Sequence, residues 1–333
     1  MAATPLDGGA ERRAQRSEKS TERTLGALSA FVLVAIAAMV VTVFIKAWPS
    51  FSYNGLGWFG TGAEPSVQLR AMHEGTPLPG HGILYFTAWQ LIWGTILTTG
   101  FAVVFALIVS TFAAIFIVEF APAGLRRLLD PVIRLLAAVP SVIYGLIGIV
   151  AIAPFLNKHV ISNSLANSVS YVVSLNGESL VTAIFLLTIM ILPIMVSISA
   201  NAFASVPAAW REGSAALGVN RWRTIWRVSL RTAWPAIAAA TVLATARALG
   251  EAVMLAMVSG GRDFAPNLLD GFALLFEPVR PLAATIFQES GSLTIGPVSH
   301  TLYAIAAVLL VSAALLSFAG WAARQPLKKY GLA

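Results

Sequence analysis

The sequence predicts an all-α polytopic membrane protein with six transmembrane helices. Hydrophobic residues make up 57% of the 333 residues and charged residues 11%, whereas roughly 25% of an ordinary soluble domain is charged. So few charges cannot cover a water-soluble surface, which argues against a cytosolic enzyme, a disordered chain and a nucleic-acid-binding protein. Six stretches reach the length of about 20 mainly apolar residues that a membrane crossing needs: 25–47, 90–118, 132–155, 179–203, 234–258 and 300–323.

The distribution of Lys and Arg predicts that both termini lie in the cytoplasm. The N-terminal tail and the fourth loop hold five each, and the second loop and the C-terminal tail hold three each. The opposite loops hold four in all, namely Arg70, Lys158, Arg262 and Arg280. Because cytoplasmic loops carry an excess of these residues, the net charge of +7 is a topology signal. We expect a multi-pass protein of the cell (inner) membrane, in contact with the lipid bilayer and not with nucleic acid.

The chain divides into four expected parts. Residues 1–24 form a cytoplasmic, disordered N-terminal tail, because they mix acids and bases with few apolar residues. Residues 25–84 hold the first transmembrane helix and its outer loop. Residues 85–323 form the core transmembrane domain, which includes the cytoplasmic loop 205–235. Residues 324–333 form a cytoplasmic C-terminal tail.

The cytoplasmic loop carries an amphipathic pattern. We expect a short helix that Ser205 caps and Gly218 ends, followed by a second helix that Asn220 caps. The second helix carries an arginine stripe at a spacing of four, made of Arg223, Arg227 and Arg231. The pattern alone suits either a basic loop held at the lipid headgroups or a helix that docks into a cytoplasmic partner. Glu119, at the end of the second span, is expected to contact a helix or this loop.

The fifth span holds two charged residues, Arg247 and Glu251, inside an apolar stretch. Four residues apart on one continuous helix, they would face the same way. Each buried charge costs about 2.5–3.5 kcal/mol near the bilayer centre, so the pair must face protein or a wet pathway. One interpretation is an ion pair that locks two helices. The other is an oxyanion site, in which Glu251 holds the guanidinium of Arg247 until an anion arrives.

A proline interrupts the third span. Pro140 removes one helix hydrogen bond, and freed backbone is tolerated where it is buried in protein or lines a cavity. Ser141 and Tyr144 follow it and carry hydroxyl groups. A plain packing kink and a break that lines a pathway both fit this pattern.

Several segments resemble known transporter families. EGSAALG, from Glu212 to Gly218, resembles the EAA loop of ABC-importer permeases, although Gly213 and Ser214 stand in place of two alanines. ARALGEAVM in the fifth span resembles the permease subunits of the bacterial high-affinity phosphate importer. So do AAVPSVIYGLIGI, WGTILTT and FIVEFAPAGLRR in earlier spans. The resemblance covers roughly residues 85–323 and is greater to PstC-type than to PstA-type subunits.

The resemblance implies the type I ABC importer permease (MetI-like) fold and a transport subunit, not an enzyme. It implies a second permease of similar fold, two ATPase subunits and an extracytoplasmic phosphate-binding protein. ATP and Mg²⁺ would bind the ATPase, and no cofactor is expected on this chain, which has no Walker A motif. The implied substrate pathway contains Arg247, Glu251, Ser141 and Tyr144. The implied ATPase-coupling residues are Trp210, Glu212, Gly213, Ser214, Ala215, Ala216, Leu217 and Gly218.

Three alternatives remain at this point. The first is a permease for another oxyanion, such as molybdate or sulfate. The second is a membrane scaffold that signals phosphate supply to a cytoplasmic partner. The third, an intramembrane enzyme using Glu251, lacks a second catalytic group. A metal site is not expected either, because HEGTPLPGH has Pro77 where an HExxH motif has its second histidine.

Overall fold

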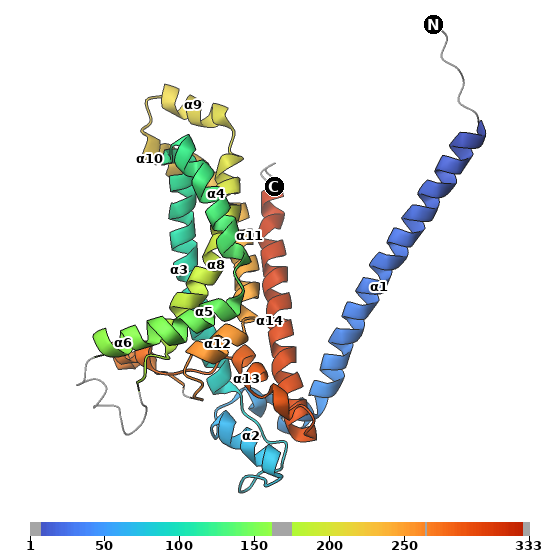
Figure 1. Cartoon of the computed structure of the whole chain (residues 1–333), viewed down its shortest axis with the longest axis vertical. Helices are drawn as coiled ribbons and strands as arrows, with labels where there is room; N and C mark the ends of the chain where they lie inside the picture. The colour runs from blue at the N-terminus through green and yellow to red at the C-terminus, as the bar shows by residue number, and fades with distance from the viewer. Residues whose placement is uncertain (1–7, 162–174, 264, 329–333) are drawn as a thin grey trace.

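The computed structural model describes residues 8–161, 175–263 and 265–328. These residues form a helical bundle with one helix leaning away from it (Figure 1). We call its two ends after the short helices that lie there, the α9 end (Ala208–Ala216) and the α2 end (Pro65–Glu74). The upright helices of the bundle are α3 (Trp89–Ile115), α4 (Ala123–Ala138), α8 (Leu180–Ala204), α11 (Leu230–Leu249) and α14 (Gly296–Lys328).

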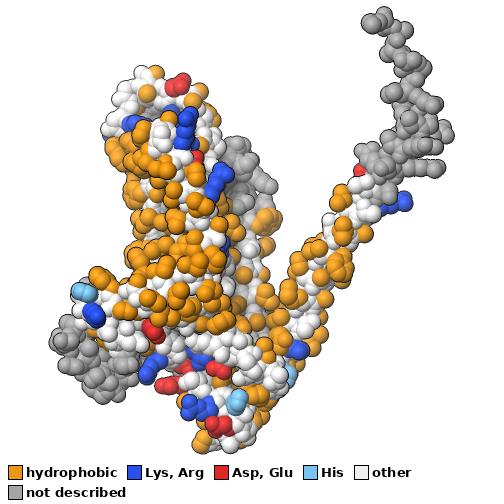
Figure 2. Space-filling view, in the orientation of Figure 1, with side chains coloured by type: hydrophobic (Ala, Val, Ile, Leu, Met, Phe, Trp, Pro, Cys, Tyr) orange, Lys and Arg blue, Asp and Glu red, His pale blue; other side chains and the backbone are white. Residues whose placement is uncertain are grey.

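Six helical segments within the described ranges are long and apolar enough to cross a membrane, which confirms the predicted number. They are Thr21–Phe59, Trp89–Phe120, Ser141–His159, Leu180–Ala204, Arg221–Leu249 and Gly296–Ala322. Hydrophobic side chains cover the middle of the bundle, and most charged side chains gather toward its two ends (Figure 2). This distribution matches an apolar slab between two aqueous phases. The fold class is therefore an all-α polytopic membrane protein.

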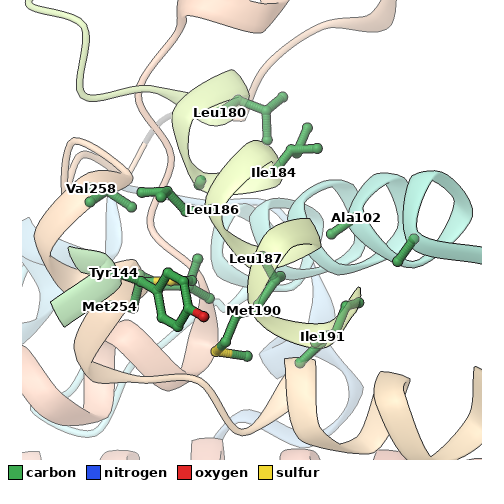
Figure 3. Close-up of a cluster of buried hydrophobic side chains, with 14 of the residues drawn as sticks. Ala102, Tyr144, Leu180, Ile184, Leu186, Leu187, Met190, Ile191, Met254 and Val258 are labelled. Carbon is green, nitrogen blue, oxygen red and sulfur yellow. The ribbon is translucent and has the colours of Figure 1, made fainter. Parts of the chain in front are cut away.

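The core lies where α8 packs against α3 and α11. The α8 side chains Leu186, Leu187, Met190 and Ile191 are almost fully buried, as expected for a helix that is hydrophobic all round. Pro193 lies within this continuous helix. Tyr144 and Met254 join the cluster from two shorter helices (Figure 3).

The third crossing is divided into pieces. The helix α4 ends at Ala138, and α5 (Ser141–Ile147) begins after an extended Val139 and Pro140. A π-helical turn then leads into α6 (Ala153–His159). The proline therefore breaks the helix, as its missing N–H and its effect on the preceding residue predict. The two sides of the break point in different directions (Figure 1).

The fifth crossing also differs from the prediction of one span over 234–258. It begins earlier, at Arg221, and ends at Leu249. A separate short helix, α12 (Val253–Val258), follows after a non-helical linker. The amide of Glu251 donates to the carbonyl of Ala248 at 3.2 Å, a contact over three residues that closes the last turn. Glu251 therefore lies outside α11, and the prediction of one continuous helix through Arg247 and Glu251 is wrong.

The first helix, α1 (Gly8–Asn54), begins well before the predicted span. Residues 8–24, expected to be disordered, are helical in the structure. The helix leans away from the bundle, and its C-terminal part packs on α14 (Figure 1). There the ammonium of Lys46 lies 5.0 Å from the centre of the Tyr303 ring. The beginning of α1 and the end of α14 both lie toward the α9 end.

A buried ionic cluster holds the α2 end together. The guanidinium of Arg280 contacts Asp263 at 3.4 Å, Glu289 at 2.8 Å and the Gln288 side-chain oxygen at 2.7 Å. Asp263 also accepts from the backbone amide of Ser66 at the start of α2. Since the Asp263 carboxylate is fully buried, Arg280 supplies the charge that makes its burial tolerable.

Candidate functional site

The structure brings together four polar residues that lie on three separate segments. Arg247 is in the last turn of α11, Glu251 is in the linker to α12, and Ser141 is the first residue of α5. The Ser141 side chain interacts with the Glu251 carboxylate, and the charge of Arg247 acts on the same carboxylate. The charge of Arg247 also acts on Tyr144, in the first turn of α5. All four predicted pathway residues are therefore neighbours at two helix breaks.

Close packing of glycines brings these breaks together. Gly145 of α5 lies against Met254 and Met257 of α12, so that an added methyl group would meet the Met257 sulfur. Gly148 lies in the same way against Val258. Small residues allow helix backbones to approach closely within a membrane. The sequence YGLIG thus positions Ser141 beside the linker that carries Glu251.

Arg247 has a side-chain N–H group that makes no hydrogen bond within the described part of the chain. Its side chain is partly buried, and its Nε atom is shielded from solvent without a hydrogen-bond partner. No ion pair within 4.0 Å joins Arg247 to Glu251 or to any other carboxylate in the described ranges. The direct ion pair considered from the sequence is therefore not formed. A buried N–H without an acceptor costs free energy, and a passing oxyanion would satisfy it.

The side chain of Tyr144 is more buried than those of Ser141, Arg247 and Glu251. Its side chain is buried in the core beside Met254 and Met190 (Figure 3). Its hydroxyl donates to the backbone carbonyl of Leu136 at 3.1 Å, across the break between α4 and α5. That carbonyl lies in the last turn of α4 and also accepts from the Val139 amide at 3.4 Å. Tyr144 therefore stabilises the break, while Ser141, Arg247 and Glu251 are the partly exposed members of the group.

The predicted docking segment forms the helix α9 at the opposite end of α11 from Arg247. Trp210 and Leu217 are 48% and 84% exposed, and Glu212, Gly213, Ala215 and Ala216 are also exposed. Gly218 has a φ of +74°, which confirms it as the residue that ends the helix. Asn220 caps the next helix through the amide of Arg223 at 2.8 Å. Ser205 does not cap α9, because its hydroxyl donates back to the Ala202 carbonyl of α8.

One face of α9 is tied to the rest of the molecule through Glu119. This carboxylate follows α3 in the chain, and only 8% of its side chain is exposed. It accepts from Arg211 of α9 at 3.2 Å and lies 3.8 Å from Arg221, which begins the fifth crossing. Arg221 also stacks on the Phe120 ring at 4.5 Å. Beside them, the hydroxyls of Ser214 and Thr224 lie 2.8 Å apart.

Sequence reasoning anticipated the loop contact of Glu119 but not its two partners. The available signal was a single acid at the end of an apolar span, facing a loop rich in arginine. Ser214, placed among the coupling residues, turns inward and leaves the outer surface of α9 to its neighbours. That surface combines exposed apolar and acidic side chains with no partner in the described chain.

Three features are those of a membrane transport permease. They are the six crossings, the polar site at two helix breaks and the exposed amphipathic helix. Residues 120–325 match the family described as binding-protein-dependent transport system inner membrane component. The match covers more than half of the chain, and the chain belongs to this family of integral inner membrane proteins.

Two relatives are similar over most of their length. The chain is 34% identical over 297 residues to a probable ABC transporter permease, YqgH, of Bacillus subtilis, covering 85% of this chain and 84% of the relative. It is 31% identical over 319 residues to the phosphate transport system permease protein PstC 1 of Mycobacterium tuberculosis, covering 92% of each.

Solved structures show the same fold. A bacterial alginate ABC transporter, in complex with an alginate pentasaccharide-bound periplasmic protein, matches with a TM-score of 0.53 and 15% identity. The match covers 94% of this chain and 98% of that one. The MetNI methionine ABC transporter matches with a TM-score of 0.51 and 18% identity, over 70% and 93% of the two chains. The fold is therefore that of a type I ABC importer permease.

Proposed function

We propose that the chain is a permease subunit of an ATP-driven importer that carries inorganic phosphate into the cytoplasm. The observation that carries this proposal is the Arg247 guanidinium, which is partly buried and has no ion-pair partner among the described residues. It lies beside Ser141 and Glu251 at two helix breaks. A guanidinium group is charged and presents several N–H donors in one plane, which suits an oxyanion. The similarity to a relative named as a phosphate transport permease supports the choice of anion.

The local chemistry supports binding that is transient. Phosphate near Arg247 would gain charge-assisted hydrogen bonds in place of water. Glu251 would compete for the same guanidinium and prevent the anion from being held too long. An ion pathway needs sites favourable enough to enter and weak enough to leave. In this proposal the chain breaks no covalent bond.

Energy for transport would come from another subunit. The exposed face of α9 would dock into an ATPase that binds ATP and Mg²⁺, and the α9 end would be cytoplasmic with both chain termini. The proposed assembly contains a second permease of similar fold, two ATPase subunits and an extracytoplasmic phosphate-binding protein at the α2 end. The Lys and Arg distribution supports this orientation.

The pathway is tested by ATP-driven uptake of phosphate into vesicles that contain the complete complex, with sulfate and molybdate as competitors. Arg247→Gln should reduce uptake to background, and Arg247→Lys should retain part of it, because lysine keeps the charge but loses the fork. Arg231→Gln is the matched control, since Arg231 lies exposed on the same helix. Normal uptake by Arg247→Gln, or preference for a competitor anion, would reject the proposal.

The docking surface is tested separately. The chain has no cysteine, so Glu212→Cys provides a single reactive thiol on the exposed face of α9. It should cross-link to the ATPase in the active complex, whereas a thiol introduced by Glu74→Cys on α2 should not. Absence of the Glu212→Cys cross-link in a complex that still transports would remove the docking assignment.

A further inference from the structure

The helix α4 has three different sides along its length. The helix packs on α8, and one of its sides is partly buried: Leu125, Leu129, Ile133 and Ala137. The second, the lipid flank, is exposed and apolar: Leu128, Val132 and Leu135. The third, the polar flank, is exposed and charged: Arg127, Asp130 and Arg134. With about 100° between successive residues, the two exposed flanks lie to either side of the partly buried one.

The charges of the polar flank have no partner among the residues that the structure describes. Arg127, Asp130 and Arg134 lie three and four residues apart, close enough to share one side of the helix. Across the described ranges, no hydrogen bond or ion pair within 4.0 Å joins their side chains to another group. A helix whose only task were to fill space between α8 and lipid would not need them.

The position of the polar flank along α4 makes lipid an unfavourable neighbour. The helix has 16 residues, which at 1.5 Å per residue is about 24 Å. Arg134 lies about 16 Å from its beginning by the same rise, seven residues before Ser141, where the third crossing begins. A charged side chain that faces lipid is unfavourable. The lipid flank offers an apolar alternative, so the polar flank faces water or protein.

The helix leads from the α9 end to the candidate anion site. In Figure 1, α4 descends along the bundle to the start of α5. Arg134 precedes Ser141 by seven residues, and the Tyr144–Leu136 hydrogen bond joins the two helices at that point. An anion leaving Ser141 and Arg247 toward the α9 end would pass a side of the protein that carries two guanidinium groups.

We infer that the polar flank of α4 lines the inner half of the transport route and briefly binds phosphate on its way to the cytoplasm. Arg134 is the first contact after Arg247, and Arg127 is the second. Asp130 stands between them and limits the local charge to one net positive, which keeps binding weak enough for release. This inference rests on the proposed function and extends it to residues outside the predicted substrate pathway.

Water access along the flank is testable because the chain has no cysteine. Ala138→Cys places a thiol one turn beyond Arg134 with both arginines intact. Val132→Cys is the matched control, two residues before Arg134 and so about 160° away around the helix. A negatively charged thiosulfonate reagent is added to inside-out vesicles that contain the complete complex, with the binding protein inside them.

The thiol of the Ala138→Cys variant should react about tenfold faster or more than that of the Val132→Cys variant, since charged reagents are excluded from lipid. Inorganic phosphate should slow the reaction of the Ala138→Cys variant, and sulfate at equal ionic strength should not. Adding Arg134→Gln to Ala138→Cys should preserve the labelling but abolish protection by phosphate. Equal rates at the two positions, or labelling without protection, would overturn the inference in favour of a partner interface or of lipid headgroups.

Uptake separates this inference from the proposed function. Arg134→Gln should lower the maximal phosphate uptake rate about tenfold, the effect of losing one charge-assisted hydrogen bond worth about 1.4 kcal/mol. Arg134→Lys should recover part of the rate, and the control Arg231→Gln should leave it unchanged. Normal uptake by Arg134→Gln alongside failure of Arg247→Gln would refute only the role of α4. Normal uptake by Arg247→Gln would refute the proposed pathway itself.

Discussion

Replacing Glu119 with glutamine should release α9 from the end of α3. The carboxylate lies 3.2 Å from Arg211 and 3.8 Å from Arg221, each through a different oxygen. Glutamine has nearly the same shape, but one oxygen becomes an amino group that cannot accept a hydrogen bond. One guanidinium then loses its acceptor, and both lose the charge.

The size of the effect follows from the two distances and from exposure. A hydrogen bond to a charged group on the largely buried Glu119 contributes about 1.5–3 kcal/mol. The longer contact involves Arg221, whose side chain is 57% exposed, and such surface pairs contribute about 0–1 kcal/mol. A combined loss of about 2 kcal/mol would make detachment of α9 about 30-fold more frequent.

Detachment should appear in two measurements. Amide hydrogen exchange in Ala208–Ala216 should speed up by a similar factor, because exchange reports local opening. In the complete complex, the amount of phosphate carried per ATP hydrolysed should fall, since motion of α9 would no longer pull on α3. Glu74→Gln, an exposed acid on α2, is the control and should change neither quantity.

A double-mutant cycle tests whether Arg211 is the partner through which Glu119 acts. In an Arg211→Gln background, Glu119→Gln should cost much less than it does in the unmodified chain, because the main contact is already lost. Fully additive effects on exchange would refute the coupling of these two residues. Unchanged exchange in the single variant Glu119→Gln would refute the whole argument.

Three further predictions concern stability. Arg280→Met should destabilise the α2 end by about 3–5 kcal/mol, because it leaves the buried Asp263 carboxylate without a positive partner. Thermal unfolding in detergent measures the loss of stability, and an unchanged Tm would contradict the prediction. Gly177→Ala should also destabilise, since Gly177 has a φ of +87° and an added methyl group would overlap the Ala153 carbonyl. Gly213→Ala should instead stabilise α9 by about 0.5–1 kcal/mol, because the surroundings of Gly213 are open and alanine favours a helix. Hydrogen exchange in α9 distinguishes stabilisation, which slows exchange, from destabilisation, which speeds it up.

Much of the architecture could be predicted from the sequence because membrane crossing depends on local composition. A run of about 20 apolar residues satisfies the bilayer without reference to any other segment, so six crossings were identifiable. The ends of short helices were identifiable for a similar reason. Gly218 and Asn220 act through their own backbone or side chain within three residues, and their positions were predicted correctly.

The tertiary structure decided where the crossings break and which side chains meet. Apolar residues continue on both sides of the Arg247–Glu251 segment, so the sequence predicted one helix where α11 and α12 are separate. Backbone groups freed by a break inside a membrane must be satisfied by neighbouring segments, and their presence is not a local property. The neighbours of Arg247 likewise come from α5, about a hundred residues earlier in the chain, and Glu119 finds Arg211 ninety-two residues later. The sequence by itself determined that charges occur within and beside apolar spans. Only packing between distant helices determined which of these charges have a partner.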